Sequence, residues 1–130
     1  MTVQYTHIHD IGLNSAIKKV SATLVPSDVQ GKQLTNQGQT DDVTLVLPPA
    51  QPGYSFCVVL STTVAKYYRL DPNGTEVIYL QGTACTGGHY VGITSAVVGA
   101  CISLMSFYDE DNSAYAWLAS VISGTWVEES

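Results

Sequence analysis

The sequence has few charged residues. Asp, Glu, Lys and Arg together make up 12% of its 130 residues, whereas an ordinary globular domain carries about 25%. Hydrophobic residues make up 45%. A monomer with so weakly charged a surface would tend to self-associate, so we expect other copies of the chain to cover much of that surface.

Basic residues are especially scarce. The chain has five Lys and Arg against eleven Asp and Glu, and its formal net charge is −6 at pH 7. Nucleic acids and anionic membrane surfaces are bound by clusters of Lys and Arg, so we expect neither as a partner. Three of the five basic residues, Lys18, Lys19 and Lys32, lie in the first forty residues, which makes that segment mildly basic and the remainder acidic.

The sequence also lacks long apolar runs and a secretory signal. No stretch of about 18 apolar residues occurs, and the N-terminal residues MTVQYTHIHD lack the basic and then apolar layout of a signal peptide. We therefore expect a soluble chain made in the cytosol. In that compartment the three cysteines, Cys57, Cys85 and Cys101, are expected to be free thiols packed as small hydrophobic side chains.

From residue 43 onward the sequence predicts short β-strands separated by turns. Asp71-Pro72-Asn73-Gly74 is the strongest turn signal, and we expect it to join two antiparallel strands. Gly99 is expected to mark a kink or bulge. About eight strands at this spacing predict an all-β fold, an antiparallel β-sandwich or jelly roll, over residues 41–130. The expected strands are 43–47, 54–60, 64–70, 75–82, 89–95, 96–108, 114–122 and 125–129.

Residues 1–40 show no sustained periodicity and are interrupted by glycine and proline. Ile17, Val20 and Leu24 have helical spacing behind Asn14, which would cap a short helix, and an extended strand is the alternative. We expect this segment to be an irregular N-terminal arm that docks on another surface.

Two groups of residues are candidates for a metal site. His7 and His9, beside Asp10, would share one face of a strand, but no third ligand stands at a metal-binding spacing, so histidines at the surface or an interface are favoured. The acidic segment 109–112 lacks the glycine and the bidentate glutamate of a calcium loop, so a solvated turn is favoured. We predict no metal site and no cofactor.

Catalytic motifs are absent from the sequence. Cys85 lies near His89, but no acid is placed to orient the histidine. The acidic residues lie in turns and at the C-terminus, where Glu128 and Glu129 are expected to form a solvated tail, so a carboxylate with a raised pKa in an apolar pocket is not expected. We predict that the protein is not an enzyme.

Eight Tyr and two Trp remain to be explained. Such side chains pack in β-sandwich cores and are also enriched at interfaces and carbohydrate-binding surfaces, because they combine apolar area with a polar group. We expect contacts between subunits to lie on the strands around residues 54–79 or on the closing segment 117–126. The candidate interface residues are Tyr67, Tyr68, Tyr79, Trp117 and Trp126.

Two segments, TNQGQTDDVTLVLPPAQPGYSF and AYAWLASVISGTWVEE, carry a recognisable pattern. A Thr-rich strand ends in L-P-x-A, a turn leads to G-x-x-F, and the chain closes with W, six residues and G-T-W. This pattern resembles small all-β structural proteins of tailed bacteriophages, among them capsid decoration (cement) proteins and fibre or spike tips. The matching positions are Leu47, Pro48, Ala50, Gly53, Phe56, Trp117, Gly124, Thr125 and Trp126.

The resemblance implies a homotrimer, made in the host cytoplasm and located on the virion. Since the sequence has no heptads and no shaft repeat, we expect a decoration protein that stabilises the phage head by binding across junctions of the major capsid protein; the alternative is a tail-fibre, spike or head-fibre tip that binds a receptor or glycan. Three copies of a docking arm would sum weak contacts into tight attachment. The candidate capsid-docking residues are Tyr5, Ile8, Ile11, Leu13, Lys18 and Lys19.

Overall fold

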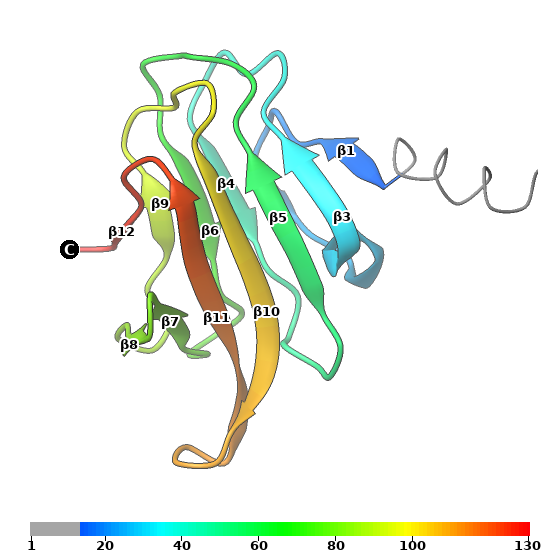
Figure 1. Cartoon of the computed structure of the whole chain (residues 1–130), viewed down its shortest axis with the longest axis vertical. Helices are drawn as coiled ribbons and strands as arrows, with labels where there is room; N and C mark the ends of the chain where they lie inside the picture. Colours follow the sequence, from blue (N-terminus) through cyan, green and yellow to red (C-terminus); the bar gives the residue numbers. More distant parts are fainter. Residues whose placement is uncertain (1–13) are drawn as a thin grey trace, which may run out of the picture.

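The computed structural model describes residues 14–130, which form two β-sheets packed face to face (Figure 1). The seven-stranded sheet has the order β1 (Ser15–Ile17), β3 (Gln30–Thr35), β5 (Ser55–Val59), β10 (Cys101–Asp109), β11 (Ala114–Ser123), β7 (Ile78–Leu80) and β8 (Thr83–Ala84). The five-stranded sheet has the order β12 (Val127–Glu128), β9 (Val91–Ile93), β6 (Tyr68–Asp71), β4 (Val43–Val46) and β2 (Ala22–Thr23), and one short 3-10 helix, η1 (Pro26–Val29), precedes β3. The all-β prediction is confirmed.

The first half of the chain winds back and forth between the two sheets. Strands β1, β3 and β5 lie side by side and parallel in one sheet, and β2, β4 and β6 lie side by side and parallel in the other. Each connection therefore crosses from one sheet to the other. The expected antiparallel arrangement is wrong for this half, because both sheets are mixed.

The second half is dominated by one long antiparallel hairpin, β10–β11, which extends beyond the other strands (Figure 1). Its register pairs Met105 with Leu118 and Asp109 with Ala114, and the ladder shifts between Cys101 and Ile102. The turn expected at residues 109–112 closes this hairpin. Gly99 lies before β10 with a φ of 92°, so it belongs to the turn that precedes the strand rather than to a kink within it.

The part of the expected N-terminal arm that the structure describes is built into the sandwich. Leu24, Val29 and Leu34 lie in the common core with the strands of the second half. Residues 14–24, for which the sequence allows a short helix or an extended strand, contain the strands β1 and β2, and each of these pairs with a parallel neighbour. Residues 14–40 are therefore part of the sandwich and do not form a separate arm.

The turn expected at residues 71–74 forms two residues later, at residues 73–76, and its predicted role is wrong. Gly74 has a φ of 55°, and the Glu76 N–H donates to the Asn73 carbonyl at 3.0 Å. The strands on either side do not pair with each other, because β6 belongs to the five-stranded sheet and β7 to the seven-stranded sheet. The turn is a crossing between layers, like the connections that precede it.

The core is centred on Trp117, which is fully buried. The Tyr54 ring stacks on it at 6.2 Å between ring centroids, and the Phe56 ring meets it edge-on at 5.8 Å. Tyr68 is also fully buried, and Trp126 is 5% exposed. Tyr68, Trp117 and Trp126 are therefore core residues rather than the interface residues that the sequence predicted.

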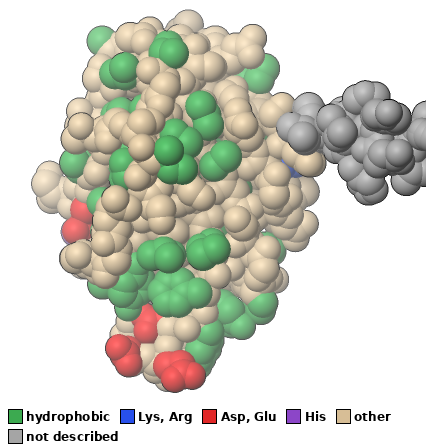
Figure 2. Space-filling view, viewed as in Figure 1, with side chains coloured by type: hydrophobic (Ala, Val, Ile, Leu, Met, Phe, Trp, Pro, Cys, Tyr) green, Lys and Arg blue, Asp and Glu red, His purple; other side chains and the backbone are tan. Residues whose placement is uncertain are grey.

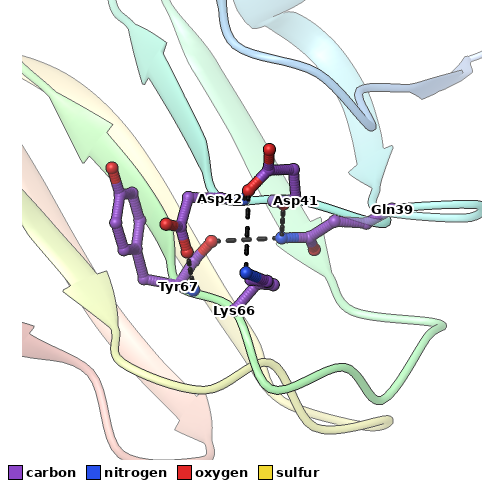
Figure 3. Close-up of polar contacts among 5 residues, drawn as sticks. All are labelled: Gln39, Asp41, Asp42, Lys66 and Tyr67. Atoms are coloured by element: carbon purple, nitrogen blue, oxygen red, sulfur yellow. Dashed lines mark hydrogen bonds and ion pairs between the residues drawn. The ribbon is translucent and has the colours of Figure 1, made fainter.

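Two crossing loops are joined by buried amide side chains. Asn36 donates to the Thr62 carbonyl at 2.9 Å and accepts from the N–H groups of Ser61 and Thr62 at 2.7 and 3.0 Å. The amide of Gln39 then reaches the carbonyls of Asp41 and Tyr67 (Figure 3). These contacts connect the β3–β4 loop to the β5–β6 loop, where no β-ladder does so.

Candidate functional site

The seven-stranded sheet has one face on the core and one face outward. Because side chains alternate along a strand, the burial of Phe56, Leu104 and Trp117 turns their neighbours outward. We call the outward side chains of β5, β10, β11 and β7 that are partly or fully exposed the outer face. It consists of Ser55, Cys57, Val59, Tyr79, Cys101, Ser103, Met105, Phe107, Leu118 and Ser120. Asp109 at the end of β10 has the same orientation but is buried, so it is not counted in this face.

None of the residues in the outer face is charged. Figure 2, which looks onto this side of the molecule, shows hydrophobic side chains over its centre and lower part, while acidic side chains gather at the lower tip and one edge. The side chain of Met105 on β10 is 49% exposed, and that of Ile122 on the neighbouring strand β11 is 66% exposed. An uncharged and partly apolar sheet face of this kind is typical of a surface that contacts another protein.

Two thiols lie in the outer face. Cys57 and Cys101 are free and half-buried, and they lie diagonally across the β5–β10 ladder, in which Cys57 faces Ser103 and Cys101 faces Val59. Burial raises the pKa of both thiols, and the neighbouring Cys101 adds to the shift at Cys57. Both thiols are therefore protonated at neutral pH, which makes them weak nucleophiles there.

A second feature is a cavity of about 410 Å³ at the base of the β10–β11 turn. Its polar lining comes from Glu76 on the loop before β7, Asp109 at the end of β10, and Asn112 in the turn. Tyr115 at the start of β11 supplies an aromatic wall, held edge-on by Tyr108 at 5.3 Å. The remaining lining residues are Ala50, Thr75, Val77, Ala114 and Ala116.

Asp109 is buried at this cavity and held by three donors. The Tyr79 hydroxyl donates to Oδ2 at 2.6 Å, the Asn112 amide donates to Oδ2 at 2.7 Å, and the Asp111 N–H donates to Oδ1 at 3.0 Å. These hydrogen bonds, the one from Tyr79 above all, lower the pKa of Asp109. The expectation that this residue would be part of a solvated turn is wrong.

Glu76 has the opposite environment. Burial raises its pKa, which the Ala50 N–H and the nearby Trp117 indole only partly oppose. Both carboxylate oxygens accept from the single N–H of Ala50, each at 3.1 Å. The Trp117 indole N–H is buried and has no hydrogen-bond partner among residues 14–130. The cavity therefore contains a half-buried carboxylate with few donors, which the sequence analysis did not expect.

Cys85, His89 and Glu128 meet where the β8–β9 loop lies against the edge strand β12. The Glu128 carboxylate lies 3.0 Å from the His89 Nδ1 and accepts from the Thr86 N–H at 2.8 Å. Burial and this carboxylate raise the pKa of the Cys85 thiol to about 11. A nucleophilic cysteine needs a base that removes its proton and a lowered pKa, whereas here an anion faces the thiol directly. The expectation that no acid is placed to orient His89 is wrong, because Glu128 does so, and Glu128 is not part of a solvated tail.

The predicted docking residues are only partly described. Tyr5, Ile8, Ile11 and Leu13, like His7 and His9, lie outside the described residues. Lys18 forms an ion pair with the buried Asp28 at 3.2 Å, and its backbone carbonyl accepts from the Tyr68 hydroxyl. Lys19 is exposed, and its aliphatic chain lies against Gly38. Of the two lysines, Lys19 has its charge exposed for a partner, whereas Lys18 ties β1 to η1.

The two candidate interface residues that are not in the core, Tyr67 and Tyr79, lie on different sheets. Tyr79 is part of the outer face, and its ring meets Phe107 at 5.4 Å. Tyr67 lies on the other sheet, where the Arg69 guanidinium is 3.5 Å from its ring centroid and 4.3 Å from that of Tyr90. Tyr67 and Tyr79 are half-exposed and lie on opposite layers of the sandwich, so they do not belong to one surface.

Residues 14–130 contain no group of three or more His, Cys, Asp or Glu placed to hold a metal ion. Within the same range, no helix has the length and hydropathy needed to cross a bilayer. No protein-family model, curated protein or solved structure matches the chain. The function is therefore argued from the outer face and from the cavity.

Proposed function

We propose that the protein is a non-enzymatic structural protein that assembles with itself through the outer face. The observation that carries this proposal is the absence of charge from ten outward side chains that cover four neighbouring strands. Together with the sequence resemblance, it supports a role as a homotrimeric capsid decoration protein that binds across junctions of the major capsid protein. The fold itself is compatible with many other roles.

Electrostatic repulsion limits which surfaces of two copies can meet. Each copy has a formal net charge of −6, so two copies that meet through acidic surfaces bring like charges together. The outer face carries no charge, and its serine hydroxyls, thiols and apolar side chains can contact the same groups on another copy. In a trimeric ring each copy meets its neighbours through two different patches, and an uncharged face can supply such patches without placing like charges opposite each other.

The experiment places a charge in the outer face. Met105→Lys should convert the oligomer to monomers, as measured by sedimentation, because assembly would bury an unpaired ammonium group. Val25→Lys is the matched control, since Val25 is 53% exposed and precedes η1, away from the outer face. A wild-type protein that sediments as a monomer at micromolar concentration would disprove self-association, and a Met105→Lys protein with the wild-type mass would disprove this interface.

The two native thiols provide a second readout. Alkylation of Cys57 and Cys101, measured at a pH near 9 because their pKa values are raised, should be slower in the oligomer than in the Met105→Lys monomer.

Attachment to the capsid needs a separate test. Removal of residues 1–13 leaves every described strand in place. If these residues dock on the capsid, the truncated trimer should lose binding to shells of the major capsid protein of the same virion.

A further inference from the structure

We infer that the cavity at the base of the β10–β11 turn binds one unit of an uncharged saccharide. Its volume of about 410 Å³ falls in the range of small-molecule sites, and its lining combines an aromatic ring with a few polar groups that converge on one space. This inference is independent of self-association through the outer face.

The polar groups at the cavity match the chemistry of a sugar. The Glu76 carboxylate accepts from one backbone N–H with both of its oxygens, so it has unused lone pairs for hydroxyl donors. The Asn112 amide uses one N–H on Asp109, which leaves its second N–H and its carbonyl oxygen for a ligand. Thr75 adds a hydroxyl that can both donate and accept.

The aromatic wall supplies the apolar contact that a sugar ring needs. Tyr115 is half-buried, lines the cavity and is held by the edge of the Tyr108 ring. A tyrosine ring offers apolar area to the C–H face of a pyranose and a polar group at its rim. Ala50, Ala114 and Ala116 keep the neighbouring walls small, so a ring-sized ligand can approach the tyrosine.

The site is also held in place before any ligand arrives. Asp109 fixes Asn112 and is itself fixed by Tyr79, while the Ala50 N–H fixes Glu76. Little side-chain freedom is therefore lost on binding. An anionic ligand is opposed by both carboxylates. The Asp109 charge is already satisfied by three donors, so Glu76 is the carboxylate that is free to accept from ligand hydroxyls.

The test is a titration of the full chain, followed by NMR or calorimetry, with the methyl glycosides of glucose, galactose, mannose and N-acetylglucosamine. At least one should bind, and Glu76→Gln should weaken its Kd by about tenfold or more, the loss expected for a hydrogen bond to a charged acceptor. Glu110→Gln is the matched control, because it removes the same charge from an exposed position in the adjacent turn. Tyr115→Ala should abolish binding, and Tyr115→Phe, which keeps the ring, should retain it.

Unfolding curves of each variant test whether the fold is intact, so that a lost affinity can be assigned to the cavity. The inference is overturned if none of the four glycosides binds at millimolar concentration, or if Glu76→Gln and Tyr115→Ala bind as tightly as the wild type. It is equally overturned if N-acetylarginine methylamide, a cationic probe, binds at the cavity more tightly than every glycoside.

Discussion

The two halves of the chain build the same sandwich in different ways. Strands β1 to β6 alternate between the sheets, and their crossing loops are joined by buried amides such as Asn36. The β10–β11 hairpin stays in one sheet and places Trp117 at the centre of the core. Both halves supply apolar side chains to the core, and the first half adds buried polar contacts that join its crossing loops. Substitutions in each half can separate these two contributions.

The largest effect is expected at the centre of the hairpin. Trp117→Ala removes the ring against which Tyr54 and Phe56 pack and leaves a cavity in the core. Truncations of this kind cost about 3–5 kcal/mol of the free energy of unfolding. Chemical denaturation monitored by far-UV circular dichroism measures the loss. Ile122→Ala, at an exposed position on the same strand, is the control, and equal losses in the two variants would contradict the assigned core.

A smaller effect is expected in the crossing loops. Asn36→Ala leaves the N–H groups of Ser61 and Thr62 without their acceptor, at a cost of about 1–3 kcal/mol for each buried group that water does not reach. The neighbouring Gln37→Ala, at an exposed position, should change stability by less than about 0.5 kcal/mol. Hydrogen exchange should show faster exchange at residues 61 and 62 in Asn36→Ala, and unchanged exchange there would refute the role given to this amide.

The smallest effect is a change in pH dependence at the hairpin turn. The pKa of Asp109 is lowered in the folded state, so its contribution to stability is present above the pKa of the unfolded chain, about 4, and is lost as the pH falls through the lowered value. Asp109→Asn should therefore flatten the decline in the free energy of unfolding below about pH 4.

The Glu110→Gln variant serves as the reference for that measurement, because Glu110 is exposed in the same turn. Glu76 contributes in the opposite direction, since its raised pKa makes the folded state more stable as the pH falls through that value. The difference between Asp109→Asn and Glu110→Gln isolates Asp109 from this background. Parallel acid-unfolding profiles for the two variants would contradict the hydrogen bonds assigned to Asp109.

The sequence predicts strands well where the signals are local. All eight segments expected after residue 43 contain a strand, because alternating side chains and turn residues are properties of neighbouring positions. Strands β1, β2 and β8 are only two or three residues long and depend on their neighbours in the sheet, so the segment alone carries little signal. The pairing of strands is even harder to predict from the sequence, since β3 and β5 become neighbours only after the chain has passed through the other sheet.

The candidate site was harder to predict from the sequence for the same reason. The sequence predicts a strand at Glu76 and a solvated turn at Asp109, but not the cavity that brings them together, because their partners Ala50 and Tyr79 are far away in the sequence. Alternation places Tyr67 and Tyr68 on opposite faces of a strand, but it does not say which face is the core. One local signal was available: Asp109 and Asn112 are three residues apart, a spacing at which their side chains can bond across a turn.

The ends of the two sheets limit how copies of this protein can meet. The edge strands β1, β8, β2 and β12 are only two or three residues long in the described part of the chain. A short edge offers few free N–H and C=O groups to a strand of another molecule, so growth by sheet extension is poorly supported. Contact through a face can close into a ring, whereas head-to-tail pairing of two sheet edges can continue without limit. The short edges thus favour an assembly of finite size over a fibril.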